Sequence, residues 1–485
     1  MRRAAATLAL LASACTTMEP HYARPSPAIP ASWPVGDPYL AQAEAGLPVL
    51  TYQQVFQDPR LQTLIAEALA NNRDLMIAAS NIAAAREQYS IQRSQLLPTV
   101  NAGAGATVRG DKSSTVTADY DAGVQVPSFE LDLFGRVRSL THVQLERYLA
   151  TEAGARSTRL SLVANVVSAW LNHAANLSLR LIAEQTAASA QKSVQLTRLR
   201  LEGGVAPRTD LDQAQQILAT AEADLARQRT AVAQDVNALQ LLVGAPIDPK
   251  LLAGSIDEAA GKIASMPAGL DSYVLLRRPD VLQAEYQLRA ANAQIGAARA
   301  ALFPRITLTG LLGLASSALA KLFTGGAFGW SAGADATYTI FQSGAGHANL
   351  RLSKAQRDAA VATYQRAIQS AFRDVADALA RRGTINDEIA ARQRSQAASA
   401  DNYTLTEARY RAGIDPFLTV LVAQRSYYTA QQQMVQTRLA AAQNIVNTYQ
   451  AIGGDALLQA TPVCQALPGD SNASSAKLAS QCSPI

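Results

Sequence analysis

The chain has 485 residues, of which 48% are hydrophobic, but only 6% are aromatic and 17% are charged. Alanine and leucine therefore carry the apolar fraction, a composition that favours long, closely packed helices over a thick globular core. The net charge of +5 is too small and too diffuse for a nucleic-acid-binding surface. We therefore expect no nucleic-acid partner.

The N-terminus has the layout of an export signal. Two arginines precede a short apolar run, and small residues then lead to Cys15. This order resembles the bacterial lipoprotein signal, which implies removal of residues 1–14, lipidation of Cys15 and an outer-membrane address. A leftover cysteine in an ordinary signal peptide is the alternative. Residues 15–50 are rich in proline, which blocks regular helix, so we predict an extended, lipidated arm.

The rest of the chain is repeated. Residues 51–250 form the first copy and residues 271–454 the second, with Gly204 of the first returning as Gly413 in the second. A duplicated architecture is therefore the first structural hypothesis. The chain then ends in a tail over residues 455–485.

Each copy contains two segments in which apolar and polar residues alternate. These segments lie at about 99–109, 119–130, 305–314 and 330–341. Alternation over about ten residues is typical of a transmembrane β-strand, and a half-buried soluble hairpin is the alternative. Hydrocarbon does not tolerate open sheet edges, and four strands cannot close a barrel. The pattern therefore implies an oligomer that pools its strands, and no later segment is apolar enough for a transmembrane helix.

Long helices follow the strands. The stretch from about Arg136 to Glu202 lacks proline and would form one helix about 100 Å long. It contains a heptad seam of apolar residues, then turns at the repeated glycine and returns as a second helix that ends at Gly244, or at Gly453 in the second copy. The predicted fold is mixed, with a membrane β-barrel and a long α-helical coiled-coil barrel.

Three stretches resemble the outer-membrane factors, the TolC-like efflux exit ducts, and fit the lipidated OprM-like branch best. They run from Asp58 to Pro98, from Phe129 to Arg138 and from Arg277 to Pro304. The resemblance implies a homotrimer that shares one 12-stranded barrel in outer-membrane lipid and continues as a tunnel into the periplasm. It also implies a periplasmic adaptor protein and a proton-driven inner-membrane pump as partners, with drugs or other small toxic solutes as cargo.

By the same resemblance, the helical turns at 203–210 and 412–419 form the tip that meets the adaptor. The first turn matches the family pattern of glycine, aliphatic residue and threonine, whereas the second has leucine at the threonine position. An ordinary capped turn, with Asp210 at the helix start, is the alternative. The implied contact residues are Gly204, Val205, Thr209, Asp210, Gly413, Ile414 and Asp415.

A candidate gate lies just beyond the second turn. Leu418, Val422 and Arg425 share one helical face. In the resembling lipoproteins a leucine and an aspartate narrow the tunnel at this level, but this chain has Val422 at the aspartate position. We therefore expect a gate closed chiefly by apolar side chains, and ordinary coiled-coil core is the alternative. Asp210, Asp212 and Asp415 are the possible local source of negative charge.

No catalytic site, metal site or cofactor is expected. Ser331 fits a hydrolase nucleophile pattern, but that pattern needs a turn into a helix and here it opens a strand. The four histidines lack metal-ligand spacing. Cys464 and Cys482 lie in the tail, where an oxidising periplasm would permit a disulfide, and free thiols are the alternative.

Three other roles fit the same elements. The duct could serve type I protein secretion or metal-ion efflux, or the chain could be a non-conducting coiled-coil stalk. The sequence does not name the cargo, the pump or the adaptor.

Overall fold

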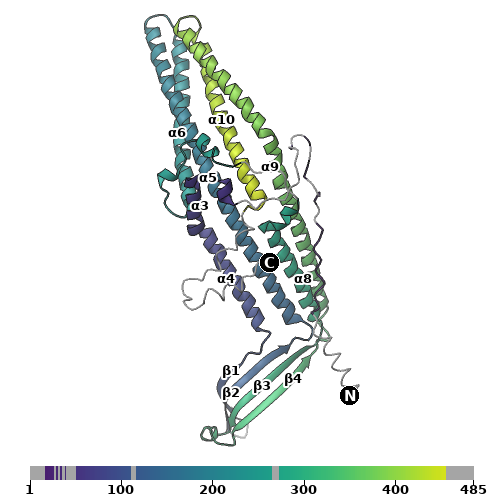
Figure 1. Cartoon of the computed structure of the whole chain (residues 1–485). Coiled ribbons are helices and arrows are strands. Elements are labelled where there is room, and N and C mark those ends of the chain that lie inside the picture. Colours follow the sequence, from purple (N-terminus) through teal and green to yellow (C-terminus); the bar gives the residue numbers. More distant parts are fainter. Residues whose placement is uncertain are drawn as a thin grey trace. The chain divides into compact units, whose positions relative to one another are not determined.

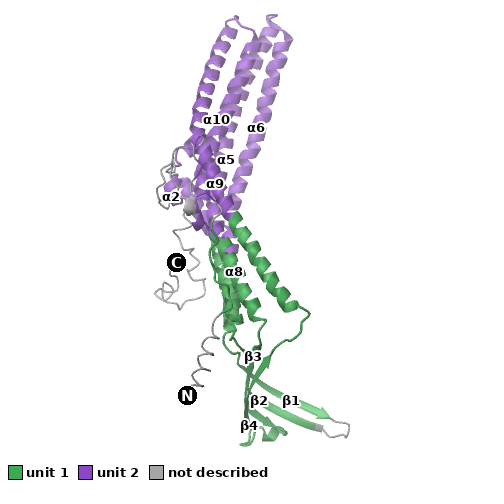
Figure 2. Cartoon of the chain, turned by 90° about the vertical axis from the view of Figure 1, so that its right-hand side faces the viewer, with its two compact units in different colours: residues 1–27, 80–153, 282–366 green, residues 28–79, 154–281, 367–485 purple. Residues whose placement is uncertain are grey.

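The computed structural model (Figure 1) describes residues 17–26, 29–30, 33–34, 36, 39, 51–110, 116–264 and 272–454. Cys15, Cys464 and Cys482 lie outside these residues, and so do the predictions made for them. The chain forms two compact units (Figure 2), composed of residues 1–27, 80–153 and 282–366 in unit 1 and of residues 28–79, 154–281 and 367–485 in unit 2. Each unit takes segments from both sequence copies, so the repeat and the units divide the chain along different lines.

Unit 1 contains one antiparallel sheet of four strands in the order β1-β2-β3-β4 (Figure 1). The strands are β1 (Asn101–Gly110), β2 (Val116–Leu131), β3 (Arg305–Ser316) and β4 (Phe328–Thr337). Pairing of β2 with β3 joins the hairpins of the two copies into one sheet. β4 ends before residues 338–341, which were predicted as strand. Arg305 at the start of β3 pairs with Thr337, so the later residues have no partner on this strand.

One face of the sheet is apolar across all four strands. The register sets Val124 opposite Leu312 and Leu312 opposite Trp330, and the rows on either side follow the same pattern. Leu312 and Trp330 are 53% and 74% exposed, so none of the residues that the structure describes covers that face. The predicted alternation is therefore present as a continuous, uncovered apolar surface.

A bulge in β2 keeps charge off this surface. Unbroken alternation would turn Glu130 toward the apolar face, because it lies an even number of residues after Val126. A register shift between Val126 and Phe129 inserts one extra residue, so Phe129 pairs with Leu308 and Glu130 pairs with Thr307 on the polar face. Simple alternation therefore fails at this point, and the bulge restores the separation.

The helices repeat as the sequence does. The long helices α5 and α9 have 67 residues each, and the returning helices α6 and α10 have 36 and 35. None of the described helices is both long and apolar enough to cross a bilayer. The helices are α2 (Tyr52–Val55), α3 (Pro59–Asn71), α4 (Arg73–Ser94), α5 (Arg136–Glu202), α6 (Arg208–Val243), α7 (Ile256–Ala260), α8 (Pro279–Ala300), α9 (Ala345–Arg411) and α10 (Phe417–Ala451), with short 3₁₀ turns at Pro249–Leu251, Ser272–Arg277 and Leu319–Lys321.

Two ion pairs close the corner between β2 and α5. In each pair the two partners are six residues apart in the chain. Arg136 binds Glu130 through both carboxylate oxygens, at 2.6 and 2.8 Å, and Arg138 binds Asp132. Gly135 between them has a φ of 75°, which favours glycine. The charged residues of the Phe129 to Arg138 stretch therefore set the direction in which the helix leaves the strand.

Arg278 has a comparable role in unit 2. Arg278 is 9% exposed, and its guanidinium donates a 2.7 Å hydrogen bond to the carbonyl of Ala451 at the end of α10. The last carbonyls of a helix lack partners within the helix and carry partial negative charge, which a cation stabilises. Asp280 binds the other side of the same guanidinium and fixes its orientation. Arg278 and Asp280, two charged residues of the Arg277 to Pro304 stretch, therefore hold the end of α10.

Candidate functional site

The two predicted turns have the same structure and lie at the same end of unit 2 (Figure 1). Gly204 and Gly413 have φ values of 71° and 75°, and the amide of the next residue bonds back to the carbonyl of Arg200 or Arg409 at 2.9 Å. This pattern ends a helix with a left-handed glycine. Prolines then cap α6 and α10 without a side-chain hydrogen bond. The duplicated glycines therefore produce duplicated turns.

Asp210 lies at the start of α6, as the alternative of an ordinary helical turn expected. Pro207 occupies the cap position, and Thr209 and Asp210 lie within the first turn of α6. Burial raises the pKa of the Asp210 carboxyl, while the nearby Arg200 acts in the opposite direction. The structure thus places Thr209 on the exposed start of a helix and Asp210 in a half-buried position beside a cation.

The exposed members of the tip are mainly apolar. Val205 is 75% exposed and Ile414 is 62% exposed, and each follows its turn glycine directly. Asp415 is different, because Arg409 binds both of its carboxylate oxygens at 2.7 and 2.9 Å and lowers its pKa. Asp415 is therefore a paired residue and a poor source of free negative charge, whereas Asp212 is exposed, with Arg208 3.8 Å away.

A compact core holds the four helices together beneath the turns. The rings of Tyr410 and Phe417 lie 5.1 Å apart, and the guanidinium of Arg200 lies 4.4 Å from the centre of the Tyr410 ring. Both helical hairpins contribute to this core, because Arg200 belongs to α5 and Tyr410 to α9. The buried members are Val194, Ala214, Tyr410, Phe417, Val420 and Leu421.

The candidate gate residues point away from this core. Leu418 and Val422 are each 57% exposed, and Arg425 is exposed on the same face of α10. The neighbouring Phe417 and Leu421 are 2% and 5% exposed and supply the packing within the chain. Leu418 and Val422 are therefore not core residues of their own chain, so a core role would require a covering partner.

Tyrosine hydroxyl groups link the two hairpins at positions that the sequence did not single out. Tyr403 on α9 lies 2.9 Å from the hydroxyl of Ser189 on α5. Tyr428 on α10 donates a 2.9 Å hydrogen bond to Asp224 on α6. Burial and the adjacent Asp224 raise the pKa of Tyr428 to about 12, so it remains a donor at neutral pH. The sequence offers one signal for these contacts, which is a tyrosine on each helix of the second hairpin. It does not identify their partners, Ser189 and Asp224, which lie about two hundred residues away in the chain.

Residues 17–26 of the predicted arm pack against other segments of unit 1. A Cβ at Gly135 would lie 2.8 Å from the Cα of Thr17, so the chain passes closely over the corner between β2 and α5. Glu19 lies 2.9 Å from His142, and Arg24 pairs with the 2% exposed Glu285. Residues 17–26 contain no helix or strand, and side-chain contacts hold them along the unit.

His142 is the centre of one of these contacts. Its two ring nitrogens lie 2.9 Å from Glu19 and 3.1 Å from Glu146. Hydrogen bonds to Glu146 and Glu19 raise the pKa of His142 to about 10. The imidazolium therefore stays charged at physiological pH and joins the arm to α5.

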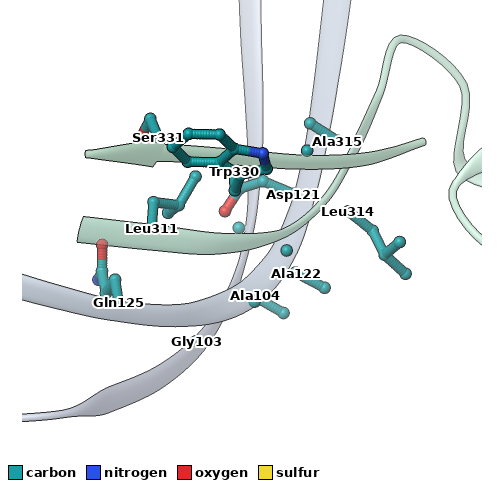
Figure 3. A pocket seen from close by; sticks show the side chains of 14 residues that line it. Gly103, Ala104, Asp121, Ala122, Gln125, Leu311, Leu314, Ala315, Trp330 and Ser331 are labelled. Atoms are coloured by element: carbon teal, nitrogen blue, oxygen red, sulfur yellow. The ribbon is translucent and has the colours of Figure 1, made fainter.

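The polar face of the sheet carries a row of glycines across all four strands. Gly103, Gly123, Gly313 and Gly329 are direct cross-strand partners. Without side chains, this row forms part of a hollow that Asp121, Gln125 and Ser331 also line (Figure 3). Ser331 lies within β4, opposite Leu311, and not at the strand-to-helix turn that exposes a hydrolase nucleophile.

The chain is similar to known efflux proteins over nearly its whole length. A family model described as outer membrane efflux protein matches residues 64–245 and 271–454. The toluene efflux pump outer membrane protein TtgC of Pseudomonas putida is 42% identical over 93% of this chain and 94% of its own. The outer membrane protein OprJ of Pseudomonas aeruginosa is 38% identical over 92% of this chain and 94% of its own.

A solved structure has the same fold. The open state of the Neisseria gonorrhoeae MtrE outer membrane channel matches with a TM-score of 0.83 and 35% identity, covering 90% of this chain and 98% of that one. The family match includes both sequence copies, and the solved channel matches both the sheet and the long helices. This chain therefore belongs to the outer membrane efflux protein family.

Proposed function

We propose that the chain is the exit duct of a tripartite efflux system, which passes small toxic solutes from an inner-membrane pump out of the cell. The observation that carries this proposal is the match of both copies to the efflux family, together with a sheet whose apolar face is uncovered. Such a duct needs no chemistry of its own and no cofactor. Energy comes from the pump, and a periplasmic adaptor joins pump and duct.

This function requires a closed oligomer, and we propose the trimer that the family resemblance implies. Strands β1 and β4 are the edges of the sheet and each pairs on one side only. In hydrocarbon the free edge groups would remain without hydrogen bonds, so a barrel must close. Three copies would supply twelve strands, within the range of known membrane barrels and as the family resemblance implies.

Lipidation of Cys15 fits the path of the arm. Thr17 lies against Gly135, where the last residues of β2 give way to α5. Thr17 therefore lies near the end of a strand whose apolar face we propose to meet lipid, and Cys15 is two residues earlier in the chain. Acyl chains there would anchor the duct beside its own barrel without spanning the membrane.

The helical turns are proposed as the adaptor contact and α10 as the gate. Val205 and Ile414 are exposed apolar residues at the end of each turn, which suits a partner surface. Leu418 and Val422 would face the tunnel and exclude water, since they are exposed within the single chain. Adaptor contact at the second turn would be mainly apolar, because Arg409 already neutralises Asp415.

A deletion and complementation experiment tests the function. Cells lacking the gene are expected to become sensitive to organic solvents and antibiotics, the cargo classes in the names of the relatives. The same sensitivity should follow deletion of the partner pump, and the wild-type gene should restore resistance. Unchanged sensitivity, with loss of a secreted protein instead, would favour the secretion role.

A further inference from the structure

The uncovered face of α10 carries a single charge. Exposed residues at spacings of four, three and four form a stripe that starts with Leu418 and Val422 and continues through Arg425 and Thr429. The next exposed residue on the stripe is Gln436. The stripe therefore changes from apolar to cationic to neutral polar, with no acidic residue.

No carboxylate in the described part of the chain forms an ion pair with this charge. Helix α10 contains neither aspartate nor glutamate, and its other arginine, Arg438, pairs with Asp257. Across the residues that the structure describes, Arg425 makes no hydrogen bond and no ion pair. The tip carboxylate on the same hairpin, Asp415, is paired with Arg409. Arg425 is thus an uncompensated guanidinium immediately behind the proposed apolar gate.

We propose that Arg425 makes the constriction selective for anionic and neutral solutes over cations. The proposal rests on the proposed function, in which three copies of α10 line one tunnel and Leu418 and Val422 close it. Three guanidinium groups would then lie at one level of the lumen. A guanidinium stays protonated at any physiological pH, and a ring of such charges determines which sign of ion passes. Unlike a ring of aspartates, this ring repels cations.

Ion selectivity in planar bilayers tests this assignment. The double substitution Leu418→Ser and Val422→Ser opens the gate, and the reversal potential in a KCl gradient then gives the permeability ratio of chloride to potassium. We expect anion selectivity, a severalfold lower ratio for Arg425→Gln, and cation selectivity for Arg425→Glu. Arg438→Gln is the matched control, because this arginine lies off the stripe and is already paired, and its ratio should be unchanged.

A second measurement does not require an open gate. Thr429→Cys places a thiol one turn from Arg425, about 5–6 Å away between Cβ atoms. The background carries Cys464→Ser and Cys482→Ser. In this background we compare the rates at which the new thiol reacts with anionic and with cationic thiosulfonates. The rates measured without Thr429→Cys are subtracted from both. In water, a unit positive charge at that distance raises the local concentration of the anionic reagent about threefold and lowers that of the cationic reagent about threefold. Arg425→Gln should therefore lower the anion-to-cation rate ratio about tenfold.

The two measurements separate the possible failures. If the double serine variant does not conduct, the proposed gate is wrong, and the thiol rates still decide the role of Arg425. A rate ratio that Arg425→Gln leaves unchanged overturns the role of Arg425, whatever the conductance. The role of Arg425 is also overturned if the double serine variant conducts and its permeability ratio is the same with arginine and with glutamine at position 425.

Discussion

The glycine row on the polar face predicts a sharp difference between two alanine substitutions in one strand. A Cβ at Gly313 would lie 2.6 Å from the carbonyl oxygen of Ala122 and 2.8 Å from the Cα of Gly123. Since carbon–oxygen contacts are normally at least about 3.3 Å, β2 and β3 would have to separate by roughly 0.7 Å. Overpacking of this kind costs about 1–3 kcal/mol. Gly313→Ala should therefore destabilise the pairing that joins the two copies.

Gly310→Ala is the matched control. Gly310 lies on the same strand, is flanked by β2 and β4, and would meet nothing within 4 Å of an added Cβ. Its substitution should change the free energy of unfolding by less than about 0.5 kcal/mol, or stabilise by restricting the unfolded chain. The measurement is the temperature at which the detergent-solubilised protein loses β-sheet circular dichroism. Equal melting temperatures for the two variants would refute the steric reasoning.

Three further predictions concern the contacts that hold the elements together. The folded pKa of His142 is raised from 6.5 to about 10, so its stabilisation is fully present below pH 6.5 and lost as pH rises through 10. His142→Gln should remove that pH dependence of the melting temperature, and a wild-type slope would contradict the pairing. Tyr428→Phe should lower the free energy of unfolding by about 1 kcal/mol through loss of the bond to Asp224, measurable by denaturant titration, whereas no change would mean that the bond is not needed. Arg278→Met should cost about 2 kcal/mol or more, because the carbonyl of Ala451 loses its donor, and amide hydrogen exchange should show faster opening at the end of α10 than in the wild-type protein.

The lengths of the helices and the places where they turn could be predicted from sequence. α5 has the predicted bounds, Arg136–Glu202, because a helix needs only a run without proline or clustered glycine. The turns at Gly204 and Gly413 depend on a left-handed backbone angle that glycine adopts without strain. Strand faces follow from alternation, which is also local. These properties depend on a few consecutive residues.

Other features depend on partners that are distant in the chain. Alternation alone puts Glu130 on the wrong face, because the bulge in β2 is set by its pairing with β3. Arg438 looks like a free cation in the sequence, but the fold places Asp257 beside it, 181 residues away in the chain. The bond between Tyr428 and Asp224 joins residues from different repeats.

The sequence by itself therefore determined the elements of this protein: two copies, each with a pair of strands and a long helical hairpin. Local backbone preference and periodicity suffice for that, because they act within a few residues. Only the tertiary structure decided which charges are neutralised and which remain. Arg425 and Arg438 are both cations on α10, and the packing of the helices pairs Arg438 with Asp257 and leaves Arg425 exposed. Coulomb energy depends on distance in space, which separation along the chain does not determine.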